Sequence, residues 1–123
     1  MINEKVYQNI YDELDKYLVS EWEKMVVYLE YGKASYSFSF FVKINGKYIK
    51  CYDLPGTSED DLSKSFGKID KIITEERTKN KEDWTNMTII VEKSGQMHSE
   101  FDYTDLSDGA YKFKKEWKKK YLV

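Results

Sequence analysis

Residues 84–107 read WTNMTIIVEKSGQMHSEFDYTDLS, and their apolar pattern distinguishes between two possible registers of a β-hairpin. A two-residue turn at Ser94-Gly95 would pair apolar with polar side chains, for example Val91 with His98. A three-residue loop ending at Gly95 instead pairs Val91 with Met97, and it makes one face of the hairpin apolar. That loop also places the glycine where a left-handed residue is needed. The pattern therefore predicts a β-hairpin with a three-residue loop.

Residues 22–52 predict a three-stranded antiparallel meander. Apolar and polar side chains alternate with a period of two through most of this segment, as they do in strands with one buried face. Asn45-Gly46 is a strong hairpin signal, because both central residues of a type I′ turn need positive φ. A two-residue loop there pairs Phe40 with Cys51. The single cysteine is therefore predicted to face the core as a small buried hydrophobe.

Helices are predicted over residues 3–18, 58–78 and 110–121, where apolar side chains recur every three or four positions. Asn3 and Ser58 can cap the first two helices through their side-chain oxygens. Four aromatic residues are predicted to supply the contacts of the third helix: Tyr111, Phe113, Trp117 and Tyr121.

In chain order these elements predict an α+β fold, α-β-β-β-α-β-β-α, with a five-stranded antiparallel sheet covered by helices. A chain of 123 residues can bury a single core, so residues 1–123 are predicted to form one domain. The spacing of the elements leaves the oligomeric state open.

Charge is unevenly distributed along the chain. Residues 1–111 hold 21 acidic against 14 basic residues, a balance of −7, whereas residues 112–123 hold six lysines and one glutamate. An acidic body repels phosphates, so direct binding of nucleic acid is not favoured. The lysine-rich segment from Lys112 to Lys120 nevertheless leaves an alternative open, a small nucleic-acid-associated or regulatory protein.

Cysteine use and hydropathy predict a cytoplasmic protein. A single cysteine excludes an intramolecular disulfide and fits a reducing compartment. No apolar run approaches the roughly 20 residues of a membrane span, and the first residues lack the pattern of a signal peptide. No membrane association is expected.

The sequence contains no recognisable catalytic, cofactor or metal-binding pattern. There is no cluster of cysteine and histidine at ligand spacing, no glycine-rich phosphate loop and no nucleophile elbow. Cys51 and His98 are predicted on different hairpins, one facing inward and one outward, so a nucleophilic pair is not expected. We therefore expect a binding protein that is not an enzyme, with no cofactor and no metal.

Clustered carboxylates beside aromatic rings are the strongest candidate for a binding site. A solvated acidic face, the electrostatics of a helix N-terminus and a glycosidase-like acid pair are the alternatives. As a binding site, the carboxylates and rings would form a patch for a basic protein partner. The candidate residues are Glu100, Asp102, Tyr103, Asp105 and Asp108, helped by Glu59, Asp60 and Asp61.

An ordered set of short motifs resembles the YezG-like family of bacterial immunity proteins. No single motif is specific, but their order and spacing match that family over nearly the whole chain. The motifs are Glu21-Trp22-Glu23-Lys24, Asp53-Leu54-Pro55, Trp84-Thr85-Asn86-Met87-Thr88, Ser94-Gly95, residues 101–107, and Trp117 followed by residues 118–122.

The resemblance implies a small cytoplasmic antitoxin of Gram-positive bacteria. Such proteins are encoded beside polymorphic toxins, often with an LXG-type export region, that leave the cell by type VII secretion. The toxin domain would be a nuclease, and the immunity protein would bind and neutralise it without catalysis. This expectation agrees with the acidic body and with the absence of a catalytic pattern.

Overall fold

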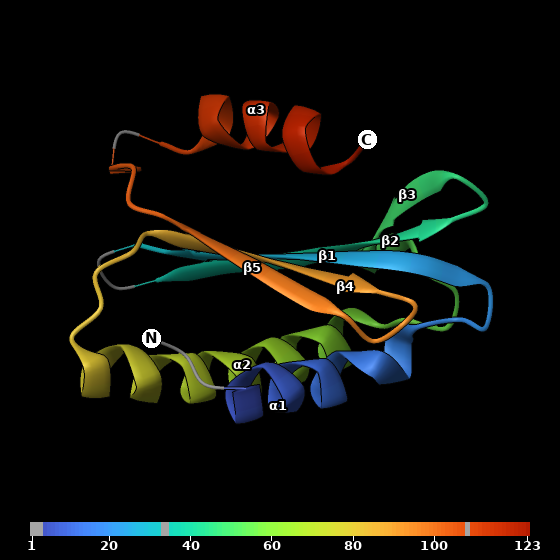
Figure 1. Cartoon of the computed structure of the whole chain (residues 1–123), viewed down its shortest axis with the longest axis horizontal. Coiled ribbons are helices and arrows are strands. Elements are labelled where there is room, and N and C mark those ends of the chain that lie inside the picture. Colours follow the sequence, from blue (N-terminus) through green and yellow to red (C-terminus); the bar gives the residue numbers. More distant parts are fainter. Residues whose placement is uncertain (1–3, 33–34, 108) are drawn as a thin grey trace.

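The structure, a computed structural model, describes residues 4–32, 35–107 and 109–123. Within these ranges three α-helices and five strands follow one another in the predicted order, so the α+β class is confirmed (Figure 1). The elements are α1 (Glu4–Leu14), β1 (Trp22–Tyr31), β2 (Tyr36–Ile44), β3 (Lys47–Lys50), α2 (Glu59–Asn80), β4 (Asn86–Glu92), β5 (Met97–Asp102) and α3 (Tyr111–Tyr121). No helix in the described ranges is long and apolar enough to cross a membrane.

The five strands form one antiparallel sheet in the order β3-β2-β1-β4-β5. The hairpin of β4 and β5 pairs Val91 with Met97, which confirms the predicted three-residue loop. Gly95 has φ 98°, a left-handed conformation that favours glycine. Asn45 and Gly46 also have positive φ, 52° and 77°, as a type I′ turn requires.

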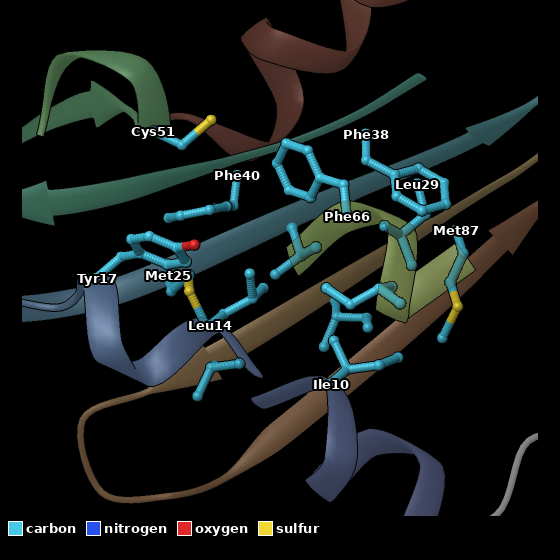
Figure 2. Close-up of a cluster of buried hydrophobic side chains, with 14 of the residues drawn as sticks. Ile10, Leu14, Tyr17, Met25, Leu29, Phe38, Phe40, Cys51, Phe66 and Met87 are labelled. Atoms are coloured by element: carbon cyan, nitrogen blue, oxygen red, sulfur yellow. The ribbon is translucent and has the colours of Figure 1, made fainter. Parts of the chain in front are cut away.

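Helices α1 and α2 cover one face of the sheet, and their shared interior is the main core (Figure 1). Figure 2 shows Leu14, Tyr17 and Phe66 from the helical layer meeting Met25 and Phe40 from the sheet. The start of α2 is fixed as predicted, because the Ser58 hydroxyl accepts a hydrogen bond from the Asp61 backbone N–H at 3.1 Å.

Helix α3 lies on the opposite face of the sheet (Figure 1). A second, smaller cluster of buried residues joins it to β1 and β2, and Trp117 supplies the contact from the helix. The other members are Val26, Tyr28 and Phe41. Strands β1 and β2 therefore bury side chains on both faces.

Several predicted details were wrong. Helix α1 ends at Leu14 and continues as a 3₁₀ helix (Asp15–Tyr17). Strand β3 ends before Cys51, which lies in a 3₁₀ helix (Cys51–Asp53) and is still fully buried. Tyr111 supplies no core contact, because it begins the first turn of α3 and is 83% exposed. The proposed cap Asn3 lies outside the described residues.

Candidate protein-binding surface

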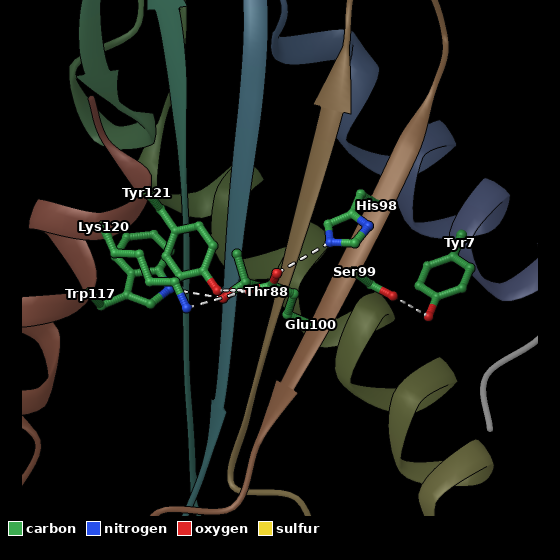
Figure 3. Close-up of polar contacts among 8 residues, drawn as sticks. All are labelled: Tyr7, Thr88, His98, Ser99, Glu100, Trp117, Lys120 and Tyr121. Carbon is green, nitrogen blue, oxygen red and sulfur yellow. Dashed lines mark hydrogen bonds and ion pairs between the residues drawn. The ribbon is translucent and has the colours of Figure 1, made fainter.

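The two faces of β5 point to different layers of the molecule. The side chains of Met97, Ser99 and Phe101 point to the α1 and α2 layer, where the Tyr7 hydroxyl lies 2.7 Å from the Ser99 hydroxyl (Figure 3). His98, Glu100 and Asp102 alternate with them and lie on the α3 side. Glu100 and Asp102 therefore share one face, and that face is next to the lysine-rich helix.

Glu100 holds the C-terminal end of α3 against the sheet. Its carboxylate accepts a hydrogen bond from the Tyr121 hydroxyl, lies 3.8 Å from the Lys120 ammonium and lies 3.3 Å from His98 Nε2 (Figure 3). The hydrogen bond from Tyr121, followed by that from His98, lowers the pKa of Glu100. Burial, reinforced by the same carboxylate, raises the pKa of Tyr121 to about 12. Glu100 thus makes intramolecular contacts that bind α3.

Acidification is expected to loosen α3. Because the folded state lowers the pKa of Glu100 below its ordinary value of 4.5, the contribution of Glu100 to docking is present above that pH. It is lost as pH falls through the lower pKa of the folded state. The amide exchange of α3, followed from pH 6 downward, would measure this loss. In Glu100→Gln this acid-dependent loosening of α3 should be absent. The same loosening in the variant would contradict its assignment to Glu100.

Asp102 and Asp105 each fix a turn after β5. Asp102 Oδ1 accepts a hydrogen bond from the Thr104 backbone N–H at 2.7 Å, and Asp105 Oδ1 accepts one from Ser107 at 2.9 Å. Burial raises the pKa of Asp102, but hydrogen bonds from Thr104 and Asn86 and the charge of Lys120 outweigh it and leave the pKa lowered. The Asp102 carboxylate is therefore ionised at neutral pH. The Tyr103 side chain between these turns is 63% exposed.

The structure brings two further acids to the same end of the sheet. Glu30 on β1 and Asp102 on β5 flank the buried Asn86 in one cross-strand row. Glu30, Asp83 and Asp105 also line one hollow of about 280 Å³. We call this surface the acidic end; it comprises Glu30, Asp83, Asp102, Tyr103 and Asp105. Sequence reasoning missed Glu30 and Asp83, because only the pairing of β1 with β4 brings them close to Asp102 and Asp105.

The other predicted acids lie elsewhere. Glu59, Asp60 and Asp61 occupy the first turn of α2, on the opposite face of the sheet from α3 (Figure 1). Asp83 of the acidic end follows the C-terminal end of α2 in the chain, whereas these three acids lie at its N-terminal end. The 22 residues of α2 therefore place the two acid groups about 30 Å apart. The structure therefore does not bring the two groups into one patch. Asp108 lies outside the described residues.

The lysine-rich helix has one face on the sheet and one in solvent. Trp117 Nε1 donates a hydrogen bond to the Thr88 hydroxyl at 2.8 Å, and Lys114 Nζ lies 5.5 Å from the centre of the Tyr28 ring. A cavity of about 200 Å³ lies beside these contacts, lined by residues that include Glu100, Asp102 and Lys120. Five lysines of α3 are exposed: Lys112, Lys115, Lys118, Lys119 and Lys120.

Cys51 and His98 lie at opposite edges of the sheet. Cys51 is buried in the main core beyond β3, at one edge of the sheet, whereas His98 is on β5 at the other edge. The two side chains therefore do not form a nucleophilic pair. Across the described ranges, no group of three or more histidine, cysteine, aspartate or glutamate side chains could hold a metal ion.

Comparison with known proteins identifies the family. The family model "Immunity protein YezG-like" matches residues 3–122. An immunity protein YezG of Bacillus spizizenii is 28% identical over 113 residues, which cover 82% of this chain and 68% of that protein. An immunity protein YezG of Bacillus subtilis is also 28% identical, over 112 residues that cover 82% of this chain and 73% of that protein. The chain belongs to the YezG-like family of immunity proteins.

Proposed function

We propose that this chain binds a cognate secreted toxin that is a nuclease and neutralises it by occlusion, without catalysis of its own. Membership of an immunity-protein family supports a protective role and a toxin partner. The resemblance of its motifs to that family favours a polymorphic toxin exported by type VII secretion. On this proposal the chain acts in the cytoplasm of the producing cell.

The observation that carries the nuclease proposal is the acidic end. Glu30, Asp83, Asp102 and Asp105 come from separate parts of the chain and meet beside an exposed tyrosine. A nuclease must present a cationic surface to its substrate, so an acidic inhibitor can take the place of the phosphates. Complementary charge also accelerates the encounter of the two proteins. The aromatic ring supplies apolar contact area at the same site.

Co-purification tests the proposed function. The tagged chain would be co-expressed with the toxin domain encoded beside it, and cleavage of DNA would be assayed with and without the chain. We expect a stoichiometric complex in which cleavage is lost. Failure to bind or protect, with both proteins folded, would contradict the proposal. A salt-dependent gel shift with duplex DNA that requires Lys112 to Lys120 would then favour the nucleic-acid alternative.

Removing charge from the acidic end is expected to slow association with the toxin. In the double variant Asp102→Asn, Asp105→Asn the amide oxygens can still accept the turn hydrogen bonds, so only the charge is lost. We expect the association rate at low salt to fall about tenfold and the salt dependence to weaken. Stopped-flow mixing of the two proteins would measure both.

The matched control removes the same charge at the far end of α2, as Glu59→Gln, Asp60→Asn. These residues lie about 30 Å from the acidic end, so their loss should change the association rate little. A larger effect in the control than in the test variant would move the contact surface to the start of α2. An unchanged rate in a folded test variant would rule out the acidic end.

A further inference from the structure

Strand β5 is an open edge of the sheet (Figure 1). The strand order leaves two edges, β3 and β5. Strand β3 has four residues and begins and ends with lysine, which is a common protection against unwanted pairing. Strand β5 has six residues and contains neither lysine nor proline. Its edge is therefore the better template for a further strand.

The register determines which backbone groups are free. The Glu92 backbone N–H donates to the Gln96 carbonyl, and antiparallel pairing repeats such bonds at every second residue. His98, Glu100 and Asp102 therefore bond to β4, whereas the N–H and C=O groups of Met97, Ser99 and Phe101 point away from it. Among the described residues, no other segment donates to or accepts from these outward backbone groups.

The side chains of β5 indicate what would fit there. On the α1 and α2 side, Met97 and Phe101 are only partly buried against the main core, so they can accept apolar side chains. On the α3 side Asp102 is acidic, whereas the carboxylate of Glu100 already contacts Tyr121, Lys120 and His98. A hollow of about 320 Å³ beside this edge is lined by Ile90, Glu92, Gln96, Met97 and His98. A strand with apolar side chains on one face and a basic side chain on the other complements both faces.

We propose that β5 pairs with an extended segment of the protein toxin, which adds a sixth strand to the sheet. The segment carries apolar side chains toward Met97 and Phe101 and a basic side chain toward Asp102. Backbone hydrogen bonds hold it along the edge, and the alternating side chains select it. This inference rests on the proposed function, because the toxin is the partner. It adds a second contact beside the acidic end, which begins where β5 ends.

Hydrogen exchange of the unaltered chain tests the pairing residue by residue. The isotope-labelled chain would be compared by NMR, free and bound to a catalytically inactivated toxin domain. In the free chain the amides of His98, Glu100 and Asp102 should be protected, because they bond to β4, and those of Met97, Ser99 and Phe101 should exchange fast. In the complex these three outward amides should slow at least tenfold.

Substitutions at Ser99 provide an independent readout. Ser99→Pro removes an outward N–H and no bond to β4, so the sheet should remain folded. It should weaken toxin binding at least tenfold. The matched control Ser99→Ala keeps the N–H and loses only the hydroxyl that contacts Tyr7, so the loss of binding in Ser99→Pro beyond that in Ser99→Ala measures the missing N–H. Circular dichroism would establish that both variants are folded.

The outcomes separate the inference from the proposed function. A complex that forms without slowed exchange at Met97, Ser99 and Phe101 would overturn the inference and leave the proposed function intact. Protection of these amides in the free chain, together with the mass of a dimer, would show that a second copy occupies the edge and would also overturn it. Absence of any complex with the toxin would overturn both.

Discussion

Replacing Trp84 with alanine is expected to lower the free energy of unfolding by about 3–5 kcal/mol. Trp84 is fully buried, and its ring lies 5.6 Å from the ring of Tyr31 and 5.5 Å from that of Phe101. The Arg77 guanidinium lies 4.5 Å from the Trp84 ring and also donates a hydrogen bond to the Trp84 carbonyl. The alanine variant would leave a cavity where α2, β1 and β5 meet. Urea denaturation followed by circular dichroism would measure the loss.

Trp84→Phe is the matched control for this effect. The indole N–H of Trp84 is buried and has no hydrogen-bond partner among the described residues, so its removal should cost little. Phenylalanine keeps an aromatic ring in the cluster, and we expect a loss of about 1–2 kcal/mol. Equal losses for the two variants would show that something other than ring packing makes Trp84 important. The acidic end adjoins Trp84, so toxin binding should weaken together with stability.

The parts of the fold that the sequence predicts are those that local chemistry determines. Asn45-Gly46 and Gly95 fixed two hairpins, because positive φ restricts the choice of residue and the apolar pattern then sets the register. Ser58 marked the start of α2 in the same way. Each of these signals lies within a few residues of the feature that it specifies.

The placement of α3 on the far face of the sheet was not predicted from its own sequence. The signal lay in β1 and β2, where Val26, Tyr28 and Phe41 interrupt the expected alternation with apolar side chains on the second face. A strand that is apolar on both faces requires a cover on each. Reading those three residues together would have indicated a helix layer there, although not which helix forms it.

The candidate site shows the same division between local and distant information. Asp102 and Asp105 were found because they lie beside Tyr103 in sequence. Glu30 joins them only through the register of β1 with β4, and a single sequence does not specify the pairing of strands that are far apart in the chain. Grouping Glu59 with these residues has the same cause, because a single sequence does not show that the length and course of α2 separate them.

Replacing Trp117 with alanine is expected to release α3 from the sheet while the main core stays folded. Trp117 is the only buried residue of α3 within the described chain. Its ring lies 4.8 Å from the ring of Tyr28 and 5.7 Å from that of Phe41, and its N–H bonds to Thr88. Truncating such a side chain costs about 3–5 kcal/mol, which is more than the few remaining contacts of the helix can offset.

The released helix should also melt. An isolated helix shorter than about 12 residues is marginal in water, and α3 has 11 residues with six lysines that repel one another. We expect the amides of α3 to lose protection from hydrogen exchange, whereas those of β1 keep it. Tyr111→Ala is the control, because this exposed ring on the same helix should contribute less than about 0.5 kcal/mol. Retained protection of α3 in Trp117→Ala would contradict this prediction. The polar contacts of Glu100, Tyr121 and Lys114 would then suffice to hold the helix, and its docking would not depend on one buried ring.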